Sequence, residues 1–199
     1  GIGIDAMKTG MLGSAELVEL VARTIDRFQL KNVVIDPVMV CKGIDTIMVP
    51  DAAAAIKQLL IQRADVITPN TLEAAYLAGL PQVKTLDEIK EAAGRIKELG
   101  AKYVVIKGGE RMENDEAIDV LYDGKEFTEM AEKKIYPSYN HGAGCTYSAA
   151  ITAGLANGLS VPEAVFQAKK FITAALRHSF VLNQYSGCTN HTAFRRWGE

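Results

Sequence analysis

The chain has 199 residues, of which 48% are apolar and 23% are charged, so we expect one domain with a sizeable core. Its 22 basic and 24 acidic residues give a formal charge of −2, which leaves no large basic field for nucleic acid or anionic lipid. No apolar run approaches the roughly 18 residues of a membrane-spanning helix. Three widely spaced cysteines favour reduced thiols in the cytoplasm over a disulfide framework.

Short β-branched runs alternate with helical patterns along the first hundred residues. The predicted strands are continuous apolar runs, as expected of strands buried on both faces: 33–35, 66–67 and 103–106. The predicted helices follow capping residues or proline and carry apolar residues at helical spacing: 14–29, 51–62 and 85–99. This alternation predicts parallel strands joined by helical crossovers.

The pattern changes in the second half of the chain. Asp123-Gly124 between the β-rich runs 117–122 and 126–130 predicts an antiparallel hairpin. Two helices are predicted after it, over about 143–157 and 161–179. We therefore expect an α/β fold, with an open, mostly parallel sheet flanked by helices and an antiparallel hairpin at one edge.

Polar residues follow three predicted strands, where ligands bind in open α/β sheets. Asp36 and Glu73 offer hard oxygen atoms for Mg²⁺, directly or through water. Lys107 could neutralise a phosphate, and Asn70 could bind a phosphate or a metal-bound water. Each residue also has a structural alternative. Asp36 could cap a turn, Asn70 could cap a helix together with Glu73, and Lys107 could simply be exposed to solvent.

A glycine-rich loop precedes the first of the late helices. Gly142, Ala143, Gly144 and Cys145 would place unpaired backbone amides at a helix N-terminus, which suits a transferring phosphoryl group. A thiol at Cys145 could act as base or nucleophile there. The alternative is a tight turn with Cys145 as a small core residue, because short glycine motifs are weak signals.

In their order along the chain, these residues resemble the ribokinase-like superfamily, within it the bacterial pyridoxal kinase and hydroxymethylpyrimidine (phosphate) kinase group. The segments that carry the resemblance are 5–12, 34–43, 66–74, 105–109, 119–124 and 141–150. The resemblance implies ATP-dependent phosphorylation of a hydroxymethyl group on a heteroaromatic ring, with ATP and Mg²⁺. We expect a single ribokinase-like kinase domain over residues 1–199 that lacks the family's opening strands.

The resemblance also implies roles for individual residues around the nucleotide. Asn70 and Glu73 match an element for Mg²⁺ and phosphate, while Lys107 and Asp119 match positions that line the ATP site. Lys169 matches a lysine that approaches the nucleotide. The loop 142–145 matches the family's anion hole, with Cys145 where many relatives have a catalytic Asp.

The substrate assignment depends on a second cysteine. Cys41 lies in a motif similar to that of dual-cysteine pyridoxal kinases, where it sits on a lid loop. A thiolate can add reversibly to the aldehyde of pyridoxal, so Cys145 could hold the ring while Cys41 closes over it. The alternative for Cys41 is simple packing. Met11 is expected to pack on the ring, and core packing is its alternative.

Three readings follow from the resemblance. Pyridoxal kinase comes first, and hydroxymethylpyrimidine or hydroxymethylpyrimidine-phosphate kinase is the second enzyme reading. Because the family's first segment supplies part of the substrate pocket, an inactive nucleotide-binding fragment is the third reading. Relatives are commonly homodimers, so a homodimer is also an expectation.

Overall fold

The computed structural model describes residues 3–40, 46–109, 112, 115–136, 139–184 and 186–198. A six-stranded sheet runs in the order β1-β2-β3-β4-β5-β6, and β7 and β8 form a separate two-stranded ribbon. The strands are β1 (Met7–Thr9), β2 (Val33–Ile35), β3 (Val66–Ile67), β4 (Tyr103–Lys107), β5 (Glu116–Tyr122), β6 (Phe127–Lys133), β7 (Phe180–Asn183) and β8 (Ser186–Cys188). The α-helices are α1 (Ala15–Phe28), α2 (Pro50–Ala55), α3 (Thr71–Ala78), α4 (Leu86–Glu98), α5 (Ala143–Ala156), α6 (Val161–Arg177) and α7 (Ala193–Trp197).

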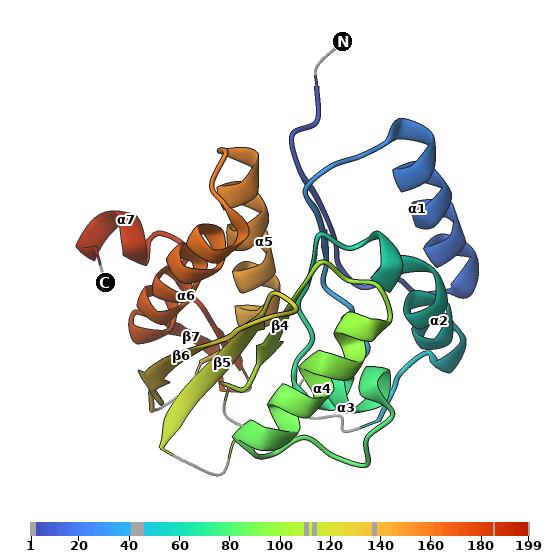
Figure 1. Ribbon diagram of the computed structural model, residues 1–199. Helices are drawn as coiled ribbons and strands as arrows, with labels where there is room; N and C mark the ends of the chain where they lie inside the picture. The colour runs from blue at the N-terminus through green and yellow to red at the C-terminus, as the bar shows by residue number, and fades with distance from the viewer. Residues whose placement is uncertain are drawn as a thin grey trace.

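The sheet separates two layers of helices (Figure 1). Strands β1 to β4 are parallel, and side chains that alternate along them enter two cores. Ile35, Ile67 and Ile106 pack with helices α1 to α4 on one face. Val34 and Val105 pack with α5 and α6 on the other face. The buried β-branched runs of the sequence are thus central strands with both faces covered, as predicted.

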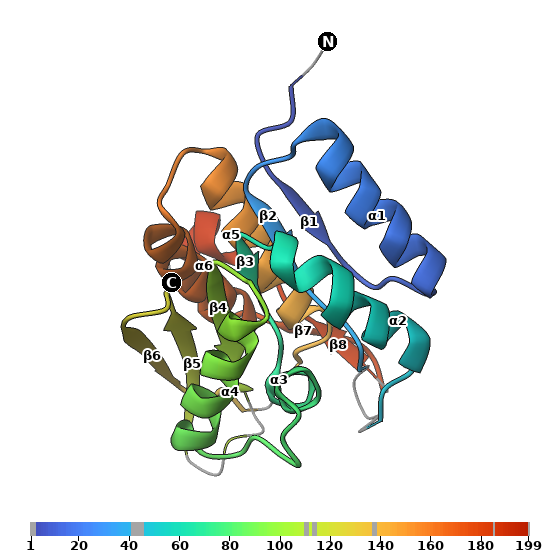
Figure 2. The same ribbon diagram turned by 45° about the vertical axis from the view of Figure 1, so that its right-hand side comes forward.

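The predicted hairpin is confirmed, because β5 pairs antiparallel with both β4 and β6. Figure 2 shows the other edge, where β1 lies beside β2 and α1 runs alongside them. The open, mostly parallel sheet with an antiparallel edge is therefore the fold expected from the sequence. Among the described helices, none is long and apolar enough to cross a bilayer.

Local sequence signals explain where most helices begin. Ser14 caps α1 by accepting a bond from Leu17 N, and Thr85 and Ser160 form capping boxes with Glu88 and Glu163. The helix predicted over 51–62 is less regular, since α2 passes into a π-helical turn (Ile56–Leu60) and a 3-10 turn (Ile61–Arg63).

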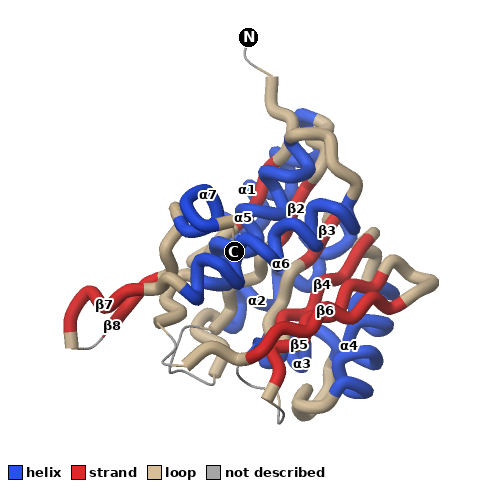
Figure 3. The backbone as a smooth tube through the Cα atoms, turned by 90° about the vertical axis from the view of Figure 1, so that its left-hand side faces the viewer, coloured by secondary structure: helices blue, strands red, loops and turns tan. Residues whose placement is uncertain are grey.

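Several elements were not predicted: β1, α3, α7 and the β7–β8 ribbon. Strands β1 and β8 have three residues each, which is too short to show a periodic pattern. The ribbon projects from the body of the molecule (Figure 3). It remains attached near the start of α5, because His141 N donates to Gly187 O.

Candidate active site

The carboxyl ends of β1 to β4 bring four polar side chains together. Asp36 follows β2 and is 1% exposed. Its Oδ1 accepts bonds from Lys107 Nζ at 3.0 Å and from Thr68 Oγ1 at 3.3 Å. Thr9, at the end of β1, donates to the Asp36 carbonyl oxygen at 3.5 Å. Asp36 and Lys107 are thus brought together as the sequence predicts, and they form an ion pair with each other.

The backbone after Asp36 is strained. Val38 has a φ of 42°, in the left-handed region that a β-branched residue rarely adopts. The next amide, Met39 N, donates to Glu73 Oε1 at 3.0 Å. The turn after β2 therefore joins the start of α3, and the buried Glu73 carboxylate holds it there.

Asn70 and Glu73 form the capping box of α3, which is the structural alternative considered for them. Asn70 Oδ1 accepts bonds from the amides of Leu72 and Glu73, and Asn70 N donates to Glu73 Oε2 at 2.9 Å. Burial raises the pKa of Glu73 above its ordinary value, and the charge of Lys107 opposes that rise. A role of either residue in binding metal or phosphate stays a prediction.

The Lys107 ammonium pairs with the buried Asp36 carboxylate at 3.0 Å and also feels the charge of the buried Glu73. Burial by itself would lower the pKa of Lys107, but the charges of Asp36 and Glu73 outweigh burial and place it above the ordinary value. The side chain of Lys107 is 13% exposed. It is therefore a fixed positive charge, and the solvated side chain considered as an alternative is wrong.

The glycine-rich loop lies over this lysine. Gly142 has a φ of 81°, which favours glycine, and α5 begins at the next residue. A β-carbon at Gly144 would lie 3.3 Å from Lys107 Nζ, so the first turn of α5 lies close to the ammonium. Cys145, in the same turn, is exposed. The first amides of a helix and a fixed lysine charge thus face one small region, which suits an anion.

Asp119 and Lys169 form a second buried ion pair. Lys169 Nζ donates to Asp119 Oδ2 at 2.8 Å and to Ala117 O at 2.9 Å, and both side chains are less than a tenth exposed. Asp119 Oδ1 accepts from Gly108 N at 3.0 Å. The pair therefore fixes the turn that follows Lys107. A direct contact of either residue with the nucleotide stays a prediction, and the pair would have to open for it.

Gly108 tolerates no side chain in this turn. A β-carbon there would lie 2.0 Å from the Ile118 carbonyl oxygen, which is backbone and cannot move aside alone. We expect Gly108→Ala to lower the free energy of unfolding by about 3 kcal/mol, because β4 and β5 must separate. Gly94→Ala is the control: nothing lies within 4 Å of its β-carbon, and alanine in a helix should add about 0.8 kcal/mol. Urea unfolding measures both, and equal stability of the two variants would contradict the expectation.

The structure shows less about the residues predicted to contact the substrate. Met11 is 55% exposed just beyond β1, so the core packing considered as its alternative is wrong. Its contact with a substrate ring stays a prediction. Cys41 lies outside the described residues. Cys188 is partly buried in β8 as a free thiol.

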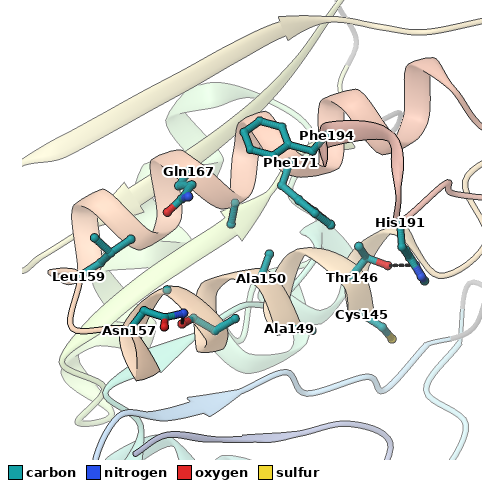
Figure 4. A pocket seen from close by; sticks show the side chains of 13 residues that line it. Cys145, Thr146, Ala149, Ala150, Asn157, Leu159, Gln167, Phe171, His191 and Phe194 are labelled. Atoms are coloured by element: carbon teal, nitrogen blue, oxygen red, sulfur yellow. Dashed lines mark hydrogen bonds between the residues drawn. The ribbon is translucent and has the colours of Figure 1, made fainter. Parts of the chain in front are cut away.

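Sequence reasoning missed several residues around the start of α5. Ser148 donates to Asp36 Oδ2 at 2.8 Å, and His191 Nε2 lies 2.9 Å from Thr146 Oγ1. His191 also lines an open pocket of about 800 Å³ that runs from Cys145 along the groove between α5 and α6 (Figure 4). Ser148 stands one helical turn after Cys145 in a run of small residues, and that spacing was the available signal.

In the described ranges, no three His, Cys, Asp or Glu side chains are grouped as ligands for a metal ion. Asp36 and Glu73 have the hard oxygen atoms that Mg²⁺ prefers, but each of these oxygens already accepts a protein hydrogen bond. A carboxylate oxygen has a second lone pair that can accept from a metal-bound water. The two residues therefore fit Mg²⁺ held through water.

Comparison with known proteins gives consistent matches. The phosphomethylpyrimidine kinase family matches residues 1–190. A pyridoxine kinase of Bacillus subtilis is 54% identical over 195 residues, which are 98% of this chain and 72% of that protein. A hydroxymethylpyrimidine/phosphomethylpyrimidine kinase of the same organism is 40% identical over 192 residues, which are 96% of this chain and 70% of that protein. The crystal structure of an ADP complex of Bacillus subtilis pyridoxal kinase is 53% identical, with a TM-score of 0.94 over 98% of this chain and 73% of that one.

Proposed function

Because the chain belongs to the phosphomethylpyrimidine kinase family, we propose that it transfers a phosphoryl group from ATP to the hydroxymethyl group of pyridoxal. The observation that carries the proposal is the anion site built from the first turn of α5 and Lys107, with Gly144 against the ammonium. Such a site stabilises negative charge on a phosphoryl group during transfer. The 54% identity to a pyridoxine kinase supports vitamin B6 as the substrate class.

The amides, Lys107 and Cys145 each have a separate role in the proposed reaction. The backbone amides at Gly142, Gly144 and Cys145 bind the phosphoryl oxygens that gain charge. Ala143 N donates to Asn140 O at 3.0 Å, so it would have to leave that acceptor to join them. Lys107 offsets the charge of the triphosphate. Cys145 is exposed beside these amides, and as a thiolate it accepts or steers the proton of the attacking alcohol. In-line transfer then needs only that the alcohol oxygen lie opposite the oxygen of the departing ADP.

The remaining nucleotide contacts are proposed from the same geometry. Mg²⁺ would supply charge neutralisation on the triphosphate, held through water by Asp36 and Glu73. Asn70 lies at the start of α3, beside Glu73, where it could reach a phosphate or a metal-bound water. Asp119 and Lys169 act by fixing the turn at Gly108, which borders the site. Free thiols at Cys145 and Cys188 suit a reducing compartment, so we place the activity in the cytoplasm.

Parallel assays with pyridoxal and with hydroxymethylpyrimidine test the choice of substrate. We expect pyridoxal to be phosphorylated with the higher kcat/KM. Cys41→Ala should lower only the pyridoxal reaction, because hydroxymethylpyrimidine has no aldehyde for a second thiol to hold. Met11→Ala should weaken binding of either ring. Equal losses on both substrates in the Cys41→Ala variant would contradict the aldehyde contact.

Hydroxymethylpyrimidine or its phosphate is the alternative substrate, favoured by the family description and by the 40% identical relative. A higher kcat/KM for hydroxymethylpyrimidine would select it. The chain spans 72% of the length of the pyridoxine kinase it matches. An inactive nucleotide-binding fragment is the third reading. ADP binding without turnover of either substrate would select that reading. Sedimentation of the purified chain tests the expected homodimer.

A further inference from the structure

Ser148 links α5 to Asp36 at the end of β2 in the proposed site, although it is buried and cannot touch a ligand. It is 0% exposed on α5, one turn after Cys145. Its Oγ lies 2.8 Å from Asp36 Oδ2 and 3.0 Å from the carbonyl oxygen of Cys145. The hydroxyl thus has two acceptors within reach of its single proton, one on the sheet and one in the first turn of the helix.

Asp36 in turn fixes the lysine that faces the anion site. Its Oδ1 accepts from Lys107 Nζ and Thr68 Oγ1, and its Oδ2 accepts from Ser148. Asp36, Thr68 and Ser148 are each no more than 1% exposed, so water cannot replace a lost partner. In the part of the chain that the structure describes, three donors hold the carboxylate, and Ser148 is the one that comes from α5.

We propose that Ser148 is a positioning residue for phosphoryl transfer, acting through Asp36 on Lys107. It holds the carboxylate so that the ammonium points at the first turn of α5, where the phosphoryl group would lie. The inference rests on the proposed function of the same site. Without the hydroxyl, Asp36 Oδ2 loses the donor that it has among the described residues, and the carboxylate can turn and carry Lys107 away from the α5 amides. A small displacement of a positioned charge reduces the rate of an enzyme more than the binding of its substrate.

Ser148→Ala tests the proposal, with Thr152→Ala as the matched control. Thr152 lies on the same helix and donates to Ser148 O at 2.8 Å, so its loss removes a hydroxyl from α5 without touching Asp36. We expect Ser148→Ala to lower kcat by about 30-fold while KM for pyridoxal changes by less than about twofold. The dissociation constant for ADP, measured by calorimetry, should rise by about fivefold, because Lys107 no longer faces the phosphates. Thr152→Ala should leave all three quantities near the wild-type values.

The outcomes separate this inference from the proposed function. A merely structural role would lower the melting temperature of Ser148→Ala and leave kcat of the folded protein unchanged, which would overturn the proposal. If the wild-type chain phosphorylates neither substrate, the proposed function fails, and the ADP measurement decides the inference by itself. A dissociation constant for ADP in Ser148→Ala equal to that of the wild type overturns it, whereas a selective rise over Thr152→Ala supports it.

Discussion

Replacing Cys145 with alanine is expected to reduce turnover of pyridoxal by about 10²-fold to 10⁴-fold, the range that a general acid–base group contributes. Cys145 is exposed in the first turn of α5, beside the amides that would bind the phosphoryl group. The substitution removes the thiol and keeps the backbone amides. The dissociation constant for ADP should therefore remain within about twofold of the wild-type value, because phosphate binding depends on the amides and Lys107.

Cys188→Ala is the matched control for this prediction. Cys188 is a free thiol in β8, and the proposed chemistry does not use it. Steady-state kinetics on both variants give kcat and KM, and calorimetry gives the affinity for ADP. Near-normal kcat in Cys145→Ala would remove the thiol from the mechanism and leave the anion site intact. Loss of ADP binding in that variant would instead show that the substitution disturbs the helix start.

The second large effect is expected at Lys107. Lys107→Met should lower the free energy of unfolding by about 3–5 kcal/mol, because it leaves a buried carboxylate without its counter-charge. Asp36 is 1% exposed and Glu73 is 2% exposed, so neither can recover the loss by contact with water. The variant should also lose most of its affinity for ADP, since the charge that faces the phosphates is gone.

Lys102→Met provides the comparison at the surface. Lys102 pairs with Asp65 at 2.7 Å, but its side chain is 72% exposed, so the loss should be at most about 1 kcal/mol. Urea unfolding at neutral pH measures both variants. Similar stability of the two would mean that Asp36 and Glu73 find other partners, and the assignment of Lys107 as their shared counter-charge would be wrong.

Local signals in the sequence explain how much of the fold could be predicted. Ser14, Thr85 and Ser160 bind amides within three residues of themselves, so the starts of α1, α4 and α6 depend on neighbouring residues alone. The buried strands at 33–35 and 66–67 were visible as unbroken β-branched runs. The β7–β8 ribbon was missed because its pairing depends on a turn without a glycine signal and on its attachment beside α5.

The site, like the fold, could be predicted from the sequence only in part. The order of its motifs along the chain identified the family and placed Asp36, Lys107 and Cys145 at strand ends or a helix start. The sequence could not show which of these groups bind one another, because the partners are far apart: Lys107 and Asp36 are separated by 71 residues. Asn70 and Glu73 had two readings, and the fold shows the capping box that the local spacing allowed.

The sequence by itself therefore determined most of the secondary-structure pattern, because that pattern depends on residues close together in the chain. Its alternation of strands and helices also predicted the mostly parallel sheet. Anion binding by the loop at 142–145 stays a prediction. Only the tertiary structure decided that Lys107 is a fixed charge, that Lys169 is held by Asp119, and that Ser148 joins α5 to Asp36 across 112 residues. The physical reason is that buried charges and hydroxyls must find partners inside the protein, and folding alone decides which partners lie within reach.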